Sequence, residues 1–446
     1  TPGSPRRRID LLAPRPRAAP MKSWLARAGY STLLRLLTPL YLLRLWWRGR
    51  REPLYRQALG ERLGFGYAAA APGALWLHAV SLGETRAAAA LIDALRAQRP
   101  GLRLLLTHGT ATGREAGRAL LREGDLQCWL PWDTPGAVRR FLRHHRPAAG
   151  VLMETEIWPN LLRVAAAEQV PMVLANARLS EKSQAKGERI GALVRPVASS
   201  LAMVLAQTEA DARRLRSFGP TRVQVCGNLK FDLSPDPQLL ARGLLWRQTL
   251  DRPVVLAAVT REGEEMPLLQ CWAALEAPRP LLLLVPRHPQ RFDEVADMVA
   301  DSGLKLARRS QWTEQPSDEA LAADLWLGDS MGEMPQYYAA ADVALLGGSF
   351  GRFGGQNLIE AAACGCPVVM GPHTYNFAEA AELSLAAGAS LRVADIEEGV
   401  SRAVALARDP TRREGVQRAL AFAAAHRGAA ERMAHEVLGV AGERLP

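Results

Sequence analysis

The sequence predicts an α/β protein made of two doubly wound domains, each a parallel sheet with helices on both faces. Two observations predict this class. Short apolar runs alternate with longer segments of helical periodicity, as in parallel sheets that are buried on both sides. This rhythm stops in a loop at residues 226–237 and then starts again, so that two blocks of domain size follow one another.

Composition excludes several other classes. Apolar residues make up 48% and charged residues 23% of the 446 residues, which is ordinary for a globular protein and excludes a disordered, collagen-like or coiled-coil chain. The five cysteines are an odd and scattered set, unlike a disulfide framework. We therefore expect a reducing, cytosolic compartment.

The basic charge of the chain belongs to its N-terminal end. Residues 1–51 hold twelve Lys or Arg and one acid, Asp10, which accounts for the whole net charge of +11. Of the 56 basic and 45 acidic residues in the chain, 44 of each remain, so the rest is neutral. A nucleic-acid-binding body is disfavoured, because a face that neutralises phosphates should leave a basic surplus there.

The N-terminal end divides into two segments. Residues 1–20 are rich in Pro and Arg and are predicted to be a disordered basic tail, or a preface to a protein that starts at Met21. Residues 21–51 are strongly apolar but interrupted by arginines. Their longest charge-free run, 36–43, is far shorter than the roughly 20 residues that span a bilayer.

The pattern of residues 21–51 is typical of amphipathic helices that lie in a membrane interface. Ser23, Arg27, Ser31 and Arg35 recur every four residues and form one helical stripe, while leucines and tryptophans cover the rest. We expect the arginines to face anionic headgroups. The alternative is a pair of helices that packs on the protein's own core.

Apolar runs in the first half are predicted to be buried strands at residues 75–80, 102–107, 150–153, 172–175 and 203–206. Helical segments lie between them, for example at 85–99 and 112–123. These elements predict an N-terminal domain over residues 52–230. The second half, residues 231–446, is predicted to be a second domain with strands at 254–258, 281–285, 342–346 and 367–370. Parallel sheets bind ligands at the carboxyl ends of their strands, so candidate residues should follow these runs.

Three motifs follow strands of the first domain. Ser81, Gly83 and Glu84 form a turn that opens a helix, where Glu84 is either catalytic or simply complements the helix dipole. The segment with Glu154 and Glu156 is suited to acid/base work or sugar binding, or is the N-terminal cap of a helix that Pro159 opens. The loop 107–113 is small and hydroxyl-rich, which suits an anion or a sugar.

Two motifs follow strands of the second domain. Arg287 and His288, between two prolines, can meet a phosphate or a base edge, or belong to a turn that the prolines fix. The glycine-rich stretch 347–360 allows a ligand close to the backbone, and Glu360, one turn into the next helix, can accept hydrogen bonds from ribose hydroxyls. It lacks the GK[ST] of a Walker A motif. We expect it to bind a nucleotide donor that carries a phosphate.

Metal and hydrolase chemistry have no comparable signal. Cys364 and Cys366 have no second pair of ligands at a zinc-site spacing, so no metal is expected. No GxSxG motif occurs, and a hydrolase triad is therefore not supported.

Together these stretches resemble the Kdo (3-deoxy-D-manno-oct-2-ulosonic acid) transferases of lipopolysaccharide assembly, from about Trp24 to about Leu438. The resemblance is carried by residues 76–84, 154–160, 175–183, 207–211, 227–232, 261–265, 286–291, 328–333 and 347–360. It implies a GT-B fold, with two Rossmann-like domains facing a central cleft. It also implies an N-terminal helix that docks on the cytoplasmic face of the bacterial inner membrane.

The resemblance further implies an inverting transfer of Kdo from CMP-Kdo to the lipid A precursor lipid IVA, without a metal or other cofactor. Glu84 matches the general base, and Glu154 and Glu156 match a second acidic motif. The implied donor-binding residues are Arg261, Glu262, Pro286, Arg287, His288, Gly348, Ser349, Gly354, Gly355, Asn357 and Glu360. The implied acceptor-binding residues are Ser81, Gly83, His108 and Thr110.

One departure and two alternatives stand beside this interpretation. Val259 lies where the family usually has a small hydroxyl residue, which puts one donor-phosphate contact in doubt. The first alternative is a nucleotide-sugar epimerase of the same fold, although the basic apolar N-terminus has no use in such an enzyme. The second is a non-catalytic, membrane-bound protein that binds polyanions through its basic arm.

Overall fold

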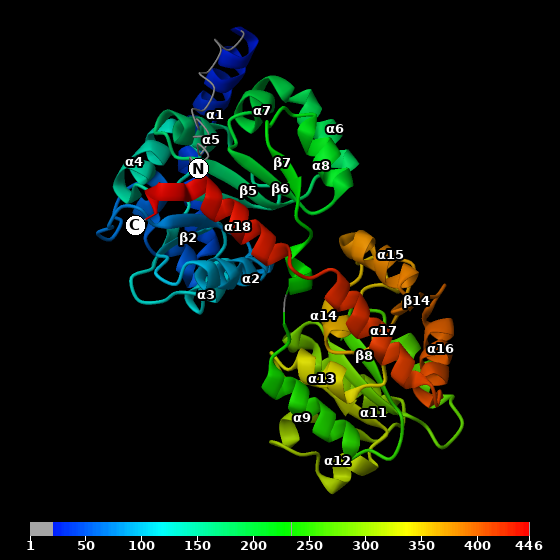
Figure 1. The fold of residues 1–446 in the computed structure, drawn as a ribbon. Coiled ribbons are helices and arrows are strands. Elements are labelled where there is room, and N and C mark those ends of the chain that lie inside the picture. Colours follow the sequence, from blue (N-terminus) through cyan, green and yellow to red (C-terminus); the bar gives the residue numbers. More distant parts are fainter. Residues whose placement is uncertain (1–20, 233, 446) are drawn as a thin grey trace, which may run out of the picture. The chain divides into compact units, whose positions relative to one another are not determined.

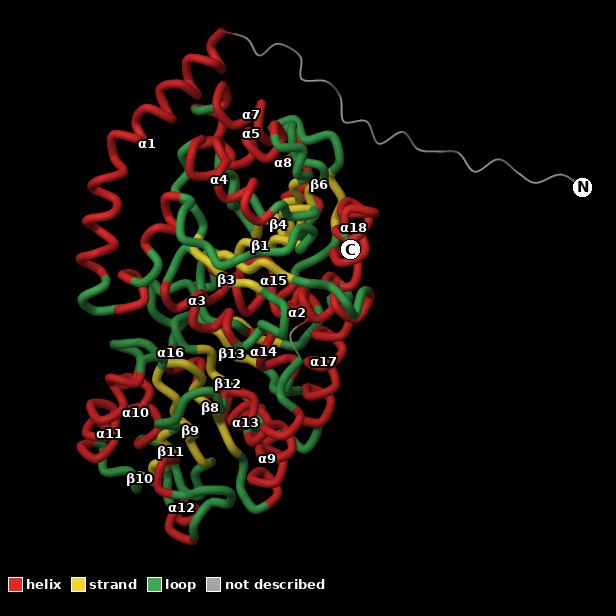
Figure 2. Tube along the Cα trace, turned by 90° about the vertical axis from the view of Figure 1, so that its left-hand side faces the viewer, coloured by secondary structure: helices red, strands yellow, loops and turns green. Residues whose placement is uncertain are grey.

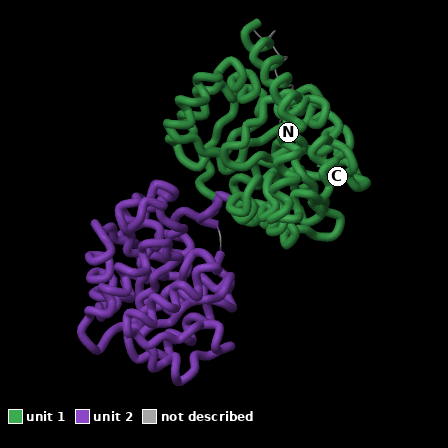
Figure 3. The backbone as a smooth tube through the Cα atoms, turned by 180° about the vertical axis from the view of Figure 1, so that it is seen from behind, with its two compact units in different colours: residues 1–228, 430–446 green, residues 229–429 purple. Residues whose placement is uncertain are grey.

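The computed structural model describes residues 21–232 and 234–445, and its chain forms two compact units (Figure 3). Unit 1 consists of Thr1–Asn228 and Ala430–Pro446, and unit 2 consists of Leu229–Ala429. Each unit contains one seven-stranded parallel sheet with helices on both faces (Figure 1). The two Rossmann-like α/β domains predicted from the sequence are confirmed. The tail expected at residues 1–20 lies outside the described residues.

The sheet of unit 1 has the strand order β3-β2-β1-β4-β5-β6-β7. Its strands are β1 (Leu75–His78), β2 (Leu104–His108), β3 (Leu126–Trp129), β4 (Ala149–Met153), β5 (Met172–Ala177), β6 (Met203–Ala206) and β7 (Val223–Val225). Its helices are α1 (Met21–Arg48), α2 (Leu82–Gln98), α3 (Ala111–Arg118), α4 (Pro135–His145), α5 (Pro159–Ala167), α6 (Glu181–Arg189), α7 (Gly191–Ala198), α8 (Glu209–Arg216) and α18 (Ala429–Ala441).

The sheet of unit 2 has the strand order β10-β11-β9-β8-β12-β13-β14. Its strands are β8 (Val254–Thr260), β9 (Leu281–Pro286), β10 (Leu306–Arg308), β11 (Leu325–Leu327), β12 (Val343–Leu346), β13 (Val368–Met370) and β14 (Ser390–Arg392). Its helices are α9 (Pro237–Gln248), α10 (Glu265–Ala273), α11 (Phe292–Asp301), α12 (Asp318–Ala322), α13 (Met334–Ala340), α14 (Leu358–Ala363), α15 (Ala378–Ala386), α16 (Ile396–Arg408) and α17 (Arg412–Ala425).

Alternation along the strands divides the core of unit 2 between the two faces of its sheet. On β9, Leu281 and Leu283 belong to one apolar cluster, and Leu282 and Leu284 belong to another. Successive side chains of a strand point to opposite faces, so both faces are buried. This is why the strand appears in the sequence as a continuous apolar run rather than an alternating one.

The expected domain division placed the last helix in the second domain, residues 231–446, and the structure differs from it. Helix α18, red in Figure 1, belongs to unit 1. It buries Met433 and Val437, and Arg432 donates to the carbonyl of Cys226 over 2.8 Å. These contacts stabilise α18 on the first sheet although it lies at the other end of the chain.

Helix α1 is a single helix of 28 residues with Pro39 inside it, and it lies along the outside of unit 1 (Figure 2). Its serine stripe faces the protein: Ser23 is buried, and the Ser31 hydroxyl donates to Oδ1 of Asn160 over 2.9 Å. The apolar side faces outward, with Leu36 and Leu40 exposed by 72% and 62%. No helix within the described residues is both long and apolar enough to span a membrane.

Candidate active site

Both sheets place their candidate residues where the strand order reverses. In unit 1 the order reverses between β1 and β4, and in unit 2 between β8 and β12. Ligands of open parallel sheets bind outside the carboxyl ends of the strands at such a point. Glu84 follows β1, Glu154 and Glu156 follow β4, and the loop 347–357 follows β12. The topology therefore assigns these motifs to the two positions where chemistry is expected.

Glu84 lies at the start of α2, where its carboxylate also helps to cap the helix. Its Oε2 accepts from the backbone N–H of Val80 over 2.8 Å, and its Oε1 accepts from the Ser81 hydroxyl over 3.1 Å. The same arrangement occurs at α16, where Glu398 accepts from the N–H of Ala394 over 2.9 Å. Capping alone therefore does not mark Glu84 as catalytic.

The surroundings of Glu84 favour a catalytic role in addition to its role in capping the helix. Burial raises the pKa of its carboxyl, and the charge of Glu154 raises it further, against hydrogen bonds that lower it. A raised pKa brings a carboxylate nearer to the operating pH, which is what a general base needs. Glu84 thus combines a fixed position with a raised pKa.

Glu154 is held by an ion pair and by an unusual backbone conformation. The Nε of Arg178 donates to its Oε2 over 2.8 Å, and Glu154 is 7% exposed. Its φ is 55°, in the left-handed region, which costs a residue other than glycine about 1–3 kcal/mol and is frequent at active sites. Because it is paired with Arg178, Glu154 is suited to hold the loop in place.

Glu156 is the carboxyl whose proton affinity is most changed. Its Oε2 accepts from Nε1 of Trp158 over 2.6 Å. Burial raises the pKa of Glu156 to about 7, with further increases from the charges of Glu84 and Glu154. The charges of the three carboxylates therefore interact, and Glu156 holds a proton over part of the neutral range.

Replacing Glu156 by glutamine is expected to increase the free energy of unfolding, and more so as the pH rises from 5 to 7. The unfolded carboxyl ionises near its ordinary value of 4.5, whereas the folded one keeps its proton up to about 7. Wild-type stability therefore falls across this window, by up to about 3 kcal/mol, and glutamine removes that fall. Urea unfolding at pH 5, 6, 7 and 8 measures the difference; an equal difference at pH 5 and 8 would contradict this explanation.

The expected acceptor-binding residues divide into two groups. Ser81 and Gly83 lie beside Glu84, and Gly83 is exposed. His108 is fully buried: its Nδ1 bonds to the carbonyl of Ala79 over 3.0 Å, its Nε2 bonds to Gln127 over 3.1 Å, and burial lowers its pKa to about 4. This geometry does not favour contact between His108 and an acceptor.

Thr110 is also engaged within the protein. It is the N-terminal cap of α3, where its hydroxyl accepts from the N–H of Gly113 over 3.2 Å and donates to the carbonyl of Val80 over 2.9 Å. The hydroxyl-rich character of this loop is thus explained by capping.

Sequence reasoning assigned no role to Arg178 or Asp133, which both follow strands of unit 1. Arg178 forms the ion pair with Glu154. Asp133 is buried and accepts from the N–H groups of Asn160 and Leu161 at the start of α5, and from the Tyr30 hydroxyl of α1 over 2.9 Å. Helix α1 is thereby tied to the helix that follows Glu156. The available signal for Arg178 was its place after the strand predicted at residues 172–175, whereas Asp133 follows β3, which was not predicted.

In unit 2, cationic side chains gather at the carboxyl ends of β8 and β9. Arg261 donates to Nε2 of His288 over 3.0 Å, and its guanidinium lies 4.7 Å from the centre of the Phe353 ring. Burial and the neighbouring arginines lower the pKa of His288. Arg287 is exposed beside them. This group is suited to bind a doubly anionic ligand.

The other expected donor residues of β8 and β9 differ in exposure. Pro286 is buried as the last residue of β9, whereas Glu262 is exposed in the turn after β8. Val259, where the sequence departs from the family, has a φ of 59° and lies at an irregularity in the pairing of β8 with β9. A β-branched residue is strained in this conformation, as residues next to functional sites often are.

The loop after β12 has the glycine conformations that its sequence predicts. Gly348, Gly354 and Gly355 have φ values of 69°, 88° and 76°. Asn357 caps α14 by accepting from the N–H of Ile359 over 3.2 Å, and Glu360 lies half-buried in the first turn.

One expectation for this loop needs correction. Gly348 and Ser349 were expected to bind the donor, but the backbone N–H groups of Gly348, Phe350 and Gly351 donate to the carboxylate of Glu264. The Ser349 side chain is buried and bonds to Leu346 and Gly371.

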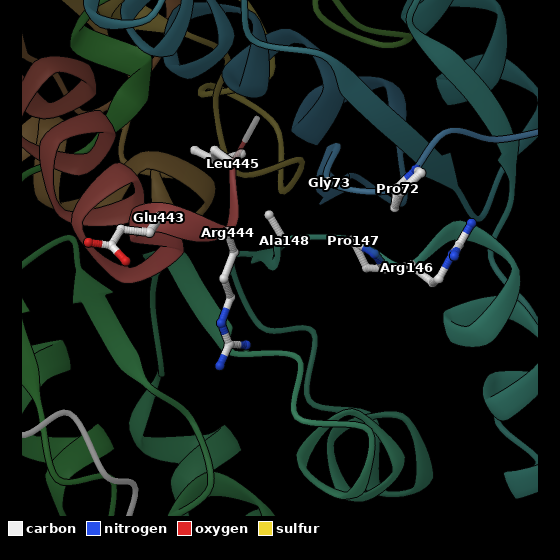
Figure 4. Close-up of a pocket in the computed structure, with 8 residues that line it drawn as sticks. All are labelled: Pro72, Gly73, Arg146, Pro147, Ala148, Glu443, Arg444 and Leu445. Carbon is white, nitrogen blue, oxygen red and sulfur yellow. The ribbon is translucent and has the colours of Figure 1, made fainter.

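Unit 1 also has a cavity of about 300 Å³ (Figure 4). It is lined by residues 72–73, which precede β1, by residues 146–148, which precede β4, and by residues 443–445. These are the amino ends of the strands, at the edge of the sheet opposite Glu84. The cavity is therefore not the candidate site.

Comparisons with known proteins show the family of the chain. A family model described as 3-deoxy-D-manno-octulosonic-acid transferase (kdotransferase) matches residues 57–233. The chain is 47% identical over 423 residues to the 3-deoxy-D-manno-octulosonic acid transferase of Bordetella pertussis, covering 92% of this chain and 98% of the relative. It is 36% identical over 389 residues to that of Haemophilus influenzae, covering 85% and 90%.

A solved structure shows the fold. The UDP-GlcNAc 2-epimerase of Neisseria meningitidis aligns with a TM-score of 0.52 at 15% identity, over 82% of this chain and 99% of that one. At this identity the likeness shows two Rossmann-like domains and nothing about the reaction. By its similarity to the two curated relatives over most of their length, the chain belongs to the Kdo transferases, the glycosyltransferases of lipopolysaccharide biosynthesis.

Proposed function

We propose that this Kdo transferase moves Kdo from CMP-Kdo to the lipid A precursor lipid IVA, with inversion at the anomeric carbon, at the cytoplasmic face of the inner membrane. The observation that carries the proposal is Glu84. It combines a fixed carboxylate, a raised pKa and a position at the strand-order reversal of unit 1.

In this mechanism Glu84 accepts the proton of an acceptor sugar hydroxyl while the hydroxyl oxygen attacks the anomeric carbon of Kdo. The bond from that carbon to the phosphate oxygen breaks, and CMP leaves with the electron pair. The Arg178–Glu154 ion pair holds the neighbouring loop, and its cation limits the negative charge around Glu84.

The donor is proposed to bind to unit 2. Arg261, Arg287 and His288 offer cations and hydrogen-bond donors for the two anionic groups of CMP-Kdo, its phosphate and the carboxylate of the sugar. Stabilising the charge that develops on the departing phosphate is the largest contribution such residues make. The described residues hold no group of three or more side chains suited to a metal, and metal-independent transfer stays a prediction.

Release of CMP that depends on the acceptor tests this function. CMP-Kdo is incubated with the protein, with and without a tetra-acylated lipid A precursor, and CMP is quantified. We expect release only with the lipid. Equal release without it would indicate hydrolysis, and conversion of a UDP-sugar instead would indicate an epimerase-like activity.

Replacing Glu360 by alanine is expected to raise the KM for the donor at least about ten-fold, because a charge-assisted hydrogen bond to a ribose hydroxyl is lost. The KM for the acceptor should not change. Glu414→Ala is the matched control, since Glu414 forms an exposed ion pair with Arg418 on α17. An unchanged donor KM would remove Glu360 from the donor site.

Membrane docking is proposed to use the outer side of α1. Leu36, Leu40, Leu43 and Trp47 are exposed by 72%, 62%, 61% and 63%, and their spacing places them on one face of the helix. Exposed arginines flank this face, as in helices that lie at anionic membrane surfaces. The serines of the opposite stripe contact the protein.

A further inference from the structure

Four backbone N–H groups of unit 2 converge on the carboxylate of Glu264. Its Oε2 accepts from Gly348 over 2.7 Å and from Arg261 over 2.9 Å. Its Oε1 accepts from Gly351 over 3.0 Å and from Phe350 over 3.2 Å. Glu264 is 6% exposed, so this is a buried carboxylate neutralised by main-chain donors from two loops.

This arrangement is an anion-binding concavity whose anion belongs to the protein. Consecutive N–H groups that point to one place form the nests in which many proteins bind phosphate. Here Gly348, with a φ of 69°, allows the chain to turn so that its own N–H and those of residues 350 and 351 point inward. The carboxylate of Glu264 fills the position that a phosphate takes in such nests.

The same carboxylate also fixes Arg261. The backbone N–H of Arg261 donates to Glu264, while its guanidinium bonds to His288 and lies over the Phe353 ring. Phe353 belongs to the loop that Glu264 holds. Glu264 therefore sets, at once, the shape of the glycine-rich loop and the position of the cation proposed to meet the donor.

We propose that Glu264 is a positioning residue of the donor site: its carboxylate occupies the N–H nest after β12 and holds this loop and Arg261 in the geometry that binds the donor. This inference rests on the proposed function. It means that the N–H groups of the nest do not bind the donor, whose anionic groups are bound by the side chains of Arg261, Arg287 and His288.

Two variants test the role of the carboxylate. Glu264→Gln keeps the volume but directs an amide N–H₂ toward N–H donors, and Glu264→Ala empties the nest. Glu276→Ala, an exposed glutamate after α10, is the control. Amide hydrogen exchange of residues 347–352 reports on the loop without any substrate. We expect it to become at least about ten-fold faster in both Glu264 variants and unchanged in the control.

Kinetics of the same proteins test the link to the donor. We expect the donor KM to rise at least about ten-fold in Glu264→Gln and Glu264→Ala, with the acceptor KM unchanged. Added formate, which supplies a carboxylate to the empty nest, should lower the donor KM of Glu264→Ala and not that of Glu264→Gln, whose side chain still fills the space. A merely destabilised variant would not respond to formate in this selective way.

Three outcomes would overturn the inference: unchanged exchange of the loop in both variants, an unchanged donor KM, or no effect of formate on folded Glu264→Ala. If Glu264→Ala does not fold, exchange and donor KM in Glu264→Gln decide the matter. A wild type that protects the loop amides but transfers no Kdo from CMP-Kdo contradicts the proposed function instead.

Discussion

Replacing Glu84 by glutamine is expected to lower kcat/KM for Kdo transfer about 10²–10⁴-fold, the usual contribution of a positioned general base. Glutamine has nearly the same shape, and its amide oxygen can still accept from the N–H of Val80, which bonds to Glu84 over 2.8 Å. It cannot take a proton from the acceptor hydroxyl. Initial rates over a range of acceptor concentrations measure the loss.

Glu398→Gln is the matched control for this experiment. Glu398 caps α16 as Glu84 caps α2, since it accepts from the N–H of Ala394 over 2.9 Å. Both variants replace a capping carboxylate by an amide of nearly the same shape. Only Glu84→Gln should lose activity. Full activity in a folded Glu84→Gln protein would show that Glu84 is a cap and not the base.

Replacing Leu36, Leu40 and Leu43 together by serine is expected to weaken binding to anionic lipid vesicles at least about 100-fold, because each buried leucine contributes about 1.5–3 kcal/mol. Transfer to an acceptor embedded in vesicles should fall in parallel. Transfer to a detergent-dispersed acceptor should be retained, since these side chains point away from the protein. Vesicle co-sedimentation and the two activity assays measure these effects.

The control is serine at Leu244 and Leu245 of α9, which are exposed by 54% and 49%. These replacements also make the surface less apolar but should not alter vesicle binding. Deletion of residues 21–51 is a poorer test, because it also removes the bonds from Tyr30 to Asp133 and from Ser31 to Asn160. Equal activity losses of the triple variant in both assays would contradict docking through this face.

The fold could be predicted from the sequence where strands lie in clear apolar runs that are buried on both faces. All nine strands expected from apolar runs are present. The five strands that were missed are β3, β7, β10, β11 and β14. Four of these have only three residues. The remaining one, β3, has four residues, of which the first two are only half-buried. Strands such as Val223–Val225, with its central Gln224 exposed, leave no apolar run to recognise.

The positions of the candidate residues were predictable, but their hydrogen-bond partners were not. The restarting strand pattern indicated which loops follow the carboxyl ends, and these loops do carry Glu84, Glu156 and the glycine-rich stretch. The partners of His108 and Ser349 come from Gln127 and Gly371, on neighbouring strands and their loops. A local pattern does not reveal whether a polar side chain is already satisfied by such distant groups.

Helix α1 shows the same limit. The four-residue stripe and the apolar remainder were visible in the sequence, yet the pattern alone did not say which side faces the protein. Ser23 is buried and Ser31 bonds to Asn160, so the stripe is largely an inward face, although Arg35 within it is exposed. Tertiary partners on α5 and after β3 decide the orientation.

The most direct test of the central claim is the mass of the lipid product. Purified wild type and Glu84→Ala are incubated with CMP-Kdo and a tetra-acylated lipid A precursor, and the lipid is analysed by mass spectrometry. We predict that the lipid gains one or more Kdo masses with the wild type only. Product from both proteins would contradict Glu84 as the base, and a folded wild type that adds no Kdo to this lipid would contradict the proposed reaction.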